Sequence, residues 1–159
     1  MTKEKQIYLI LHNIRSIQNV GAIFRTADAA GMSKIFLTGY TPAPIDRFGR
    51  ARGDFAKTAL GAQNIMAWES INSINFLIKK LKKEKIKIIA IEQSKNAIDY
   101  KKIKIKFPSA FIFGNEVRGL SKSILNKSDK IAYIKMFGGK ESLNVSVAAG
   151  IFIFRVLEI

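Results

Sequence analysis

The sequence predicts a single α/β domain built on a mainly parallel sheet flanked by helices. Three observations predict this class: a length of 159 residues, a hydrophobic content of 48%, and short apolar runs that alternate with segments of helical spacing. Strands that alternate with helices favour parallel pairing, because a parallel pair needs a crossover connection. The chain contains no linker and no internal repeat, so we expect one domain over residues 1–159.

The first half is expected to hold two strands and two helices. In chain order, the pattern predicts a strand at 6–11, a helix at 19–30, a strand at 34–39, a loop at 40–52 and a helix at 68–83. Asn19 suits the N-cap of the first helix, because its side chain can accept from free backbone N–H groups. Gly31 suits the end of the same helix.

The second half is expected to hold three strands, a short helix and a long C-terminal helix. In chain order these are strands at 85–91 and 110–113, a helix at 121–127, a strand at 130–134 and a helix at 142–157. The last helix is apolar nearly all round, in Val145, Val147, Ile151, Phe152, Phe154 and Val156. Such a helix must be buried on several sides, and a subunit interface achieves this, so we expect a homodimer.

The charge of the chain points to a polyanionic partner. Lys and Arg total 27 against 12 for Asp and Glu, which gives a net charge of +15. Nucleic acid is the leading candidate, because neutralising phosphates releases counterions. A bias toward lysine, visible in the Ile- and Lys-rich stretch 74–106, explains the charge equally well. Charge alone identifies no reaction.

Several classes are excluded or disfavoured by composition. Cysteine is absent and His12 is the single histidine, so disulfides and thiolate metal sites are excluded and no metal is expected. Residues 1–6 are polar and unlike a signal peptide, and the apolar runs are shorter than a membrane span. We therefore expect a cytoplasmic protein that binds no membrane.

The first stretch that can carry chemistry is residues 13–31. A strand leads into a small-residue turn and a helix that holds Asn19, Gly21 and Arg25. Gly21 allows a backbone or a ligand to approach closely, and the guanidinium fork of Arg25 suits a phosphate. Taken alone, the stretch favours an ordinary capped helix with a surface pair between Arg25 and Asp28.

The second stretch is the loop after the strand at 110–113. Gly114, Glu116, Arg118 and Gly119 follow a buried strand, at the position where ligands bind in α/β sheets. The spacing is superficially that of a P-loop, but Leu120 stands where that motif requires lysine. The alternative is a tight turn with solvated Glu116 and Arg118.

The third stretch is residues 131–146. A strand, a glycine pair and a polar helix start that includes Ser142 and Asn144 follow one another. Free backbone groups of such a loop could hold an adenine or the amino acid end of a cofactor. The alternative is a plain loop with Ser142 as the helix N-cap, and Ser142 can fill both roles.

Together and in this order, the three stretches closely resemble the motifs of the SpoU or TrmH-type methyltransferases of the SPOUT superfamily. The resemblance runs from about residue 6 to 157 and includes the segment 57–62. It implies an α/β fold whose C-terminal segment threads a loop to form a deep trefoil knot, a rare exception to the usual connection rules. It also implies S-adenosylmethionine held within the knot, no metal, and a dimer in which each site receives a residue from the other subunit.

The resemblance transfers roles to residues at matching motif positions. The catalytic set is Asn19, Arg25, Glu116, Ser142 and Asn144. The cofactor-binding set acts largely through backbone groups and apolar contacts, and comprises Ile91, Gly114, Ile134, Met136, Ser142 and Leu143. The main departure from larger members is length, since no additional RNA-binding domain is present in these 159 residues.

The implied reaction is methylation of a ribose 2′-hydroxyl in RNA. Small stand-alone members often act on tRNA, so tRNA is favoured over rRNA, and a catalytically inactive RNA-binding module is the alternative. The resemblance places Arg25 at the reacting hydroxyl. Because a guanidinium stays protonated, we interpret Arg25 as a phosphate clamp that stabilises the alkoxide, and His12 as structural or peripheral. A basic cluster in the 40–52 loop is expected to contact RNA, namely Arg47, Arg50 and Arg52.

Overall fold

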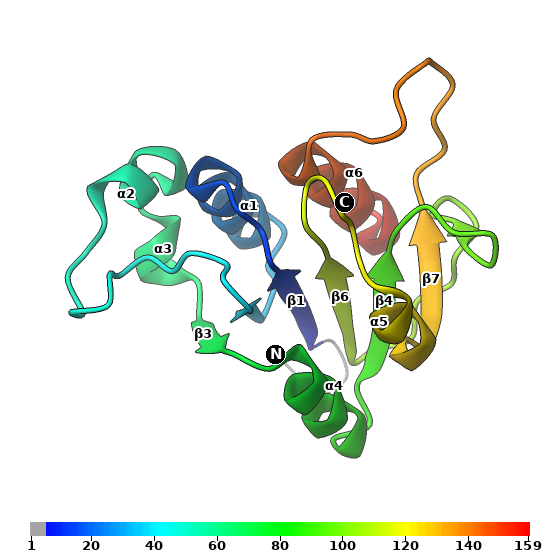
Figure 1. The fold of residues 1–159 in the computed structure, drawn as a ribbon, viewed down its shortest axis with the longest axis horizontal. Helices are drawn as coiled ribbons and strands as arrows, with labels where there is room; N and C mark the ends of the chain where they lie inside the picture. Colours follow the sequence, from blue (N-terminus) through cyan, green and yellow to red (C-terminus); the bar gives the residue numbers. More distant parts are fainter. Residues whose placement is uncertain (1–5) are drawn as a thin grey trace.

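The computed structural model describes residues 6–159 and contains one seven-stranded sheet in which every pairing is parallel. The strand order is β3-β2-β1-β6-β4-β7-β5 (Figure 1). The strands are β1 (Ile7–His12), β2 (Lys34–Thr38), β3 (Trp68–Ile71), β4 (Lys87–Ile91), β5 (Ile98–Asp99), β6 (Ser109–Phe113) and β7 (Lys130–Tyr133). The helices are α1 (Ile17–Ala29), α2 (Gly53–Ala59), α3 (Ala62–Ile65), α4 (Ile74–Lys83), α5 (Lys122–Lys127) and α6 (Val145–Leu157). The predicted α/β class is confirmed.

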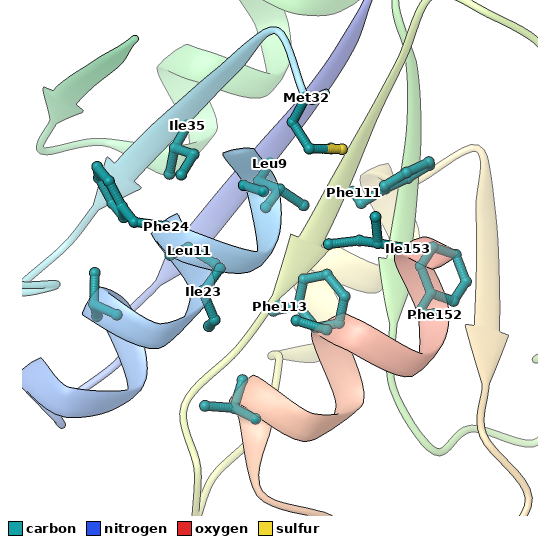
Figure 2. Close-up of a cluster of buried hydrophobic side chains, with 14 of the residues drawn as sticks. Leu9, Leu11, Ile23, Phe24, Met32, Ile35, Phe111, Phe113, Phe152 and Ile153 are labelled. Atoms are coloured by element: carbon teal, nitrogen blue, oxygen red, sulfur yellow. The ribbon is translucent and has the colours of Figure 1, made fainter. Parts of the chain in front are cut away.

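The helices cover both faces of the sheet. Successive strand side chains point to opposite faces, so alternate residues of the central strands enter two separate cores. The larger core joins β1 and β6 to α1 and α6, and Figure 2 shows Phe24 of α1 and Phe152 of α6 on this face. Phe152 packs edge-on against Phe111, with ring centroids 5.1 Å apart. The smaller core joins Ile10 and Ile88 to α4 and α5.

The predicted helix at 68–83 is wrong in its first part. Trp68–Ile71 forms β3, which pairs with β2 at the edge of the sheet, and the helix α4 begins only at Ile74. Ser73 caps the helix, because its hydroxyl accepts from the Phe76 N–H at 3.2 Å. Pairing with β2 therefore overrides the helical spacing that includes Ile71. The elements α2, α3 and β5 were not predicted.

Both predicted N-caps are also displaced. Ser16, rather than Asn19, caps α1 and accepts from the Asn19 N–H at 3.2 Å. Asn144, rather than Ser142, caps α6 and accepts from the Ser146 N–H at 2.9 Å. The consequence is that the side chains of Asn19 and Ser142 are available for other contacts. Gly21 of α1 faces α2, where a Cβ would collide with the Thr58 hydroxyl, so it serves close helix packing.

The C-terminal helix buries one side and leaves another exposed. Phe152 and Ile153 are fully buried on the larger core, together with Val145 and Ala149. On the other side Val147 is 49% exposed, while Ile151 and Phe154 are each 37% exposed. The prediction of burial on several sides is therefore met on one side only within a single chain. Within residues 6–159, no helix has the length and apolar character needed to cross a bilayer.

Candidate functional site

A cavity of about 300 Å³ opens at the carboxyl ends of β4, β6 and β7. This is the edge of a parallel sheet at which ligands bind in α/β folds. Every residue of the predicted cofactor-binding set lines it, namely Ile91, Gly114, Ile134, Met136, Ser142 and Leu143. These residues come from three segments that are far apart in the sequence. The fold thus assembles the predicted set into one site.

The second-motif loop forms a tightly closed wall of this cavity. The Asn115 carboxamide oxygen accepts from the N–H groups of Val117 at 2.9 Å and Arg118 at 2.8 Å, and Asn115 forms a bridge with Gly119. At Gly114 a Cβ would lie 2.8 Å from the carbonyl oxygen of Gly119, so only glycine fits without movement. The loop is therefore a tight turn, and this turn shapes one wall of the cavity.

A chain of hydrogen bonds joins three predicted catalytic residues beside the cavity. The Asn19 carboxamide donates to Glu116 Oε1 at 3.3 Å, and the Asn144 carboxamide donates to Asn19 Oδ1 at 3.1 Å. Glu116 also accepts from the backbone N–H groups of Arg15 at 3.1 Å and Ser16 at 3.2 Å. Each of the three motifs thus contributes one member to a single network.

The environment of Glu116 keeps its carboxylate ionised at neutral pH. Partial burial by itself raises the pKa of Glu116, but the backbone N–H groups of Arg15 and Ser16 and the Asn19 side chain more than offset it. The net result is a pKa below the ordinary value of 4.5. A carboxylate held in this way accepts hydrogen bonds and organises the loop. It is a poor general acid.

Arg25 lies on another surface. It is exposed on α1, where it lines a hollow with Thr26, Thr58 and Phe154, and it does not line the cofactor cavity of its own chain. The hollow adjoins the exposed apolar side of α6. Of the predicted catalytic residues, Glu116 and Ser142 line the cavity and Asn19 and Asn144 are linked to Glu116. Arg25 is the member that one chain does not bring to the site.

Residues 40–52 contain no helix or strand, as predicted, and two of their three arginines are paired with carboxylates. Arg50 Nε lies 2.9 Å from Asp46 Oδ2, and Arg52 Nη2 lies 3.1 Å from Asp54 Oδ2. The guanidinium of Arg47 lies 4.7 Å from the ring centroid of Phe48, which is 67% exposed. The loop therefore presents a cation and an aromatic ring to solvent.

A small group of lysines lies at the opposite end of the strands, at their amino ends. Four lysines at or near the amino ends of β4 and β7 line a hollow of about 310 Å³ with Asp129: Lys87, Lys104, Lys106 and Lys130. His12 Nδ1 lies 2.9 Å from the Thr38 hydroxyl oxygen, and burial lowers the pKa of His12. Among residues 6–159 there is no group of three or more His, Cys, Asp or Glu that could hold a metal ion.

Two polar residues that line the cavity lie outside all three motifs and were not predicted as site residues. Glu92 and Gln93 follow β4 directly, next to Ile91. The available signal was their position, because polar residues immediately after a buried parallel strand lie at the ligand-binding edge. They belong to none of the three motifs.

The SpoU rRNA Methylase family model matches residues 6–154 of the chain. The chain belongs to this family. The motif resemblance is therefore confirmed over nearly the whole sequence, and it agrees with the assembly of the predicted cofactor set in one cavity. The deep C-terminal knot stays a prediction for this SpoU-family chain.

Named relatives act on two classes of RNA. The tRNA (guanosine(18)-2′-O)-methyltransferase of Aquifex aeolicus is 30% identical over 157 residues, covering 96% of this chain and 69% of the relative. The 23S rRNA (guanosine-2′-O-)-methyltransferase of Blochmanniella floridana is 31% identical over 152 residues, covering 96% of this chain and 57% of the relative. The chain thus spans between 57% and 69% of the length of these two SpoU-family relatives.

A solved methyltransferase structure shares the fold. The AdoMet-bound rRNA methyltransferase from Sinorhizobium meliloti superposes with a TM-score of 0.85 at 28% sequence identity, covering 98% of this chain and 57% of that one. The likeness extends over the whole sheet and its helices. The structural match and the family match therefore agree.

Proposed function

We propose that this chain is an S-adenosylmethionine-dependent RNA methyltransferase that modifies a ribose 2′-hydroxyl, with tRNA favoured over rRNA. The observation that carries the proposal is the convergence of all six expected cofactor residues on one cavity, with the Asn19–Glu116–Asn144 network beside it. Both named relatives are guanosine 2′-O-methyltransferases, one for each RNA class.

The residues present fit the cofactor. Apolar side chains of Ile91, Ile134, Met136 and Leu143 can cover an adenosyl group, and the loop after β7 supplies backbone groups outside any strand or helix. The carboxylate of Glu116 places a negative charge at the same cavity, where a cationic cofactor favours it. When bound, S-adenosylmethionine supplies a methyl group activated by a sulfonium.

The protein residues must orient the ribose and stabilise the developing alkoxide. Arg25 is the candidate for the second task, because its guanidinium can clamp the neighbouring phosphate through two hydrogen bonds and stabilise negative charge. It stays protonated, so the phosphate or a water accepts the hydroxyl proton. The Asn19–Glu116–Asn144 network holds the first-motif helix against the other two motif loops.

A homodimer completes the proposed site. Arg25 stands outside the cavity of its own chain and beside Phe154, on a surface where α6 exposes Val147 and Ile151. Packing α6 against a second copy buries these apolar side chains and brings Arg25 to the cavity of the partner. The C-terminal knot, a cytoplasmic location and a reaction without metal belong to the same proposal.

RNA is held by positive charge outside the cavity. The candidates are the arginines of the 40–52 loop. Arg47 takes part in none of the ion pairs found in residues 6–159, and its guanidinium lies over the ring of Phe48. An exposed aromatic ring beside cations suits a single-stranded or looped RNA, because bases stack on such rings.

The proposal is tested first by titrating the purified protein with S-adenosylmethionine and S-adenosylhomocysteine in a calorimeter. One site per subunit with micromolar affinity is expected. Methyl transfer from labelled cofactor to bulk tRNA and to rRNA then separates the two substrates. RNA binding without binding of either cofactor form would instead support the catalytically inactive RNA-binding module.

A further inference from the structure

Glu92 and Gln93 occupy a special place in the sheet. β4 lies between β6 and β7, so the residues that follow it are the neighbours of both loops that wall the cavity. The side chains of Glu92 and Gln93 make hydrogen bonds to these two loops, one to each. The end of β4 can therefore hold both walls at once, because the strand order here is β6-β4-β7.

Glu92 holds the loop after β6. Its Oε2 accepts from the backbone N–H of Leu120 at 2.8 Å, and its Oε1 accepts from the N–H of Gln93 at 2.9 Å. The carboxylate rests on Gly119, where φ is +64° and a Cβ would collide with Oε2. Glycine at position 119 thus allows the left-handed backbone conformation and leaves space for the Glu92 carboxylate.

Gln93 holds the segment after β7. Its Nε2 donates to the carbonyl oxygen of Ile134 at 2.7 Å. Ile134 follows the last residue of β7 and is one of the residues expected to contact the cofactor. A hydrogen bond to its carbonyl fixes the orientation of the peptide that begins this segment.

We propose that Glu92 and Gln93 are positioning residues that hold the two walls of the cofactor cavity in the arrangement that binds ligand. This inference rests on the proposed function, because it takes the cavity as the S-adenosylmethionine site. Loops that are already ordered lose little conformational freedom when the ligand binds, so Glu92 and Gln93 raise the affinity for the cofactor by preorganisation. Replacing either residue should weaken cofactor binding while the fold persists, since neither side chain belongs to the two hydrophobic cores.

The test is calorimetric titration of the full chain with S-adenosylhomocysteine, comparing the native protein with Gln93→Ala and Glu92→Gln. Removal of one hydrogen bond is expected to weaken binding by about fivefold to tenfold. The midpoint of thermal unfolding should stay close to native. The matched control is Gln63→Ala, because Gln63 accepts a hydrogen bond from the Gly61 N–H at 3.0 Å, far from the cavity.

Gln93→Glu gives a readout that general loosening of the structure would not produce. At about pH 7.5 its carboxylate faces the Ile134 carbonyl oxygen without a donor, and binding should weaken about tenfold or more. Lowering the pH toward about 5 protonates a share of this carboxyl, which then donates to the same oxygen, so affinity should recover relative to Gln93→Ala.

Native-like affinity in both Gln93→Ala and Glu92→Gln would overturn the positioning role while leaving the proposed function intact. A flat pH response of Gln93→Glu would likewise contradict the hydrogen bond to Ile134. Absence of ligand binding by the native chain would overturn the proposed function, and the positioning role with it.

Discussion

Replacing Glu116 with glutamine tests the network that joins the three motifs. The carboxylate accepts three hydrogen bonds, from Arg15 N–H, Ser16 N–H and the Asn19 side chain, at 3.1 to 3.3 Å. Glutamine keeps the shape but offers one acceptor oxygen, and its amide N–H₂ turns two further donors toward groups that themselves donate. The substitution therefore removes the charge and leaves at least one donor without its partner.

The expected cost can be worked from these hydrogen bonds. An unpaired donor costs about 1–3 kcal/mol when buried, and partial exposure of Glu116 to water brings the figure to about 1–2 kcal/mol. For a chain of this size such a destabilisation lowers the thermal midpoint by about 2–8 °C. Methyl transfer should fall further, by about tenfold or more, because Asn19 loses the carboxylate that orients it, and Asn144 in turn donates to Asn19.

The assay compares thermal unfolding and initial rates of methyl transfer for native protein, Glu116→Gln and the control Glu69→Gln. Glu69 pairs with Lys34 on the edge of the sheet, far from the cavity, and an exposed pair contributes at most about 1 kcal/mol. Full activity of Glu116→Gln with a native midpoint would refute the reasoning that this carboxylate organises the site.

The pKa shift of Glu116 adds a pH dependence with a definite sign. Its folded pKa lies below the ordinary 4.5, so its contribution to stability is fully present above that value and is lost as pH falls through the folded pKa. Urea unfolding should show the stability gap between native and Glu116→Gln to be constant near neutral pH and to shrink below about pH 4.5. A gap that widens on acidification would contradict the assigned hydrogen bonds.

Three further predictions address Arg25, the basic loop and the dimer. Arg25→Lys should lower the methyl-transfer rate about tenfold or more, because an ammonium cannot form the bidentate clamp, and a near-native rate would remove the clamp from the mechanism. Changing the three loop arginines to alanine should weaken RNA binding and flatten its salt dependence, by about 0.7–0.9 in log–log slope for each phosphate that is no longer neutralised. The control removes three exposed lysines of α4, Lys79, Lys82 and Lys83. An equal effect on RNA binding in this control would show that only the total charge matters. Phe154→Asp should shift sedimentation from dimer to monomer, whereas Phe76→Asp, on exposed α4, should not; a native protein that sediments as a monomer would end the dimer proposal.

The sequence predicted the α/β class and the central strands, because a strand that is buried on both faces is a short continuous apolar run in the sequence. It failed at residues 68–83, where four residues of β3 continue the helical spacing of α4. Only pairing with β2 distinguishes the two, and that partner is distant in the sequence. The short helices α2 and α3 were missed for a related reason, since neither has the length to show a period.

The cofactor residues were predicted through the order of the motifs, and the three-dimensional network was not. Asn19 looked like a helix cap, but a cap one turn earlier at Ser16 leaves its side chain to reach Glu116. Nothing in the local sequence shows that Glu116 will meet residues about a hundred positions away. Glu92 and Gln93 escaped notice because their partners, Leu120 and Ile134, contribute only backbone atoms.

The arginines of the 40–52 loop lie on an irregular segment, as predicted, but the sequence did not show that two of them form ion pairs. Two of its arginines face carboxylates two or four residues away, at Asp46 and Asp54. Such local pairs weaken the inference from composition to RNA binding, because each arginine must leave its partner to bind a phosphate. RNA contact by Arg47, which is in neither pair, stays a prediction.

The most direct test of the central claim is nucleoside analysis of RNA methylated by the purified protein. Bulk tRNA and rRNA are incubated with methyl-labelled S-adenosylmethionine, digested to nucleosides and separated by mass. We predict label on a 2′-O-methylated ribose, at higher yield from tRNA, with the initial rate of labelling about tenfold or more lower in the Arg25→Lys variant. Label on a base with none on ribose, or transfer to neither RNA by a protein that binds the cofactor, would contradict the claim.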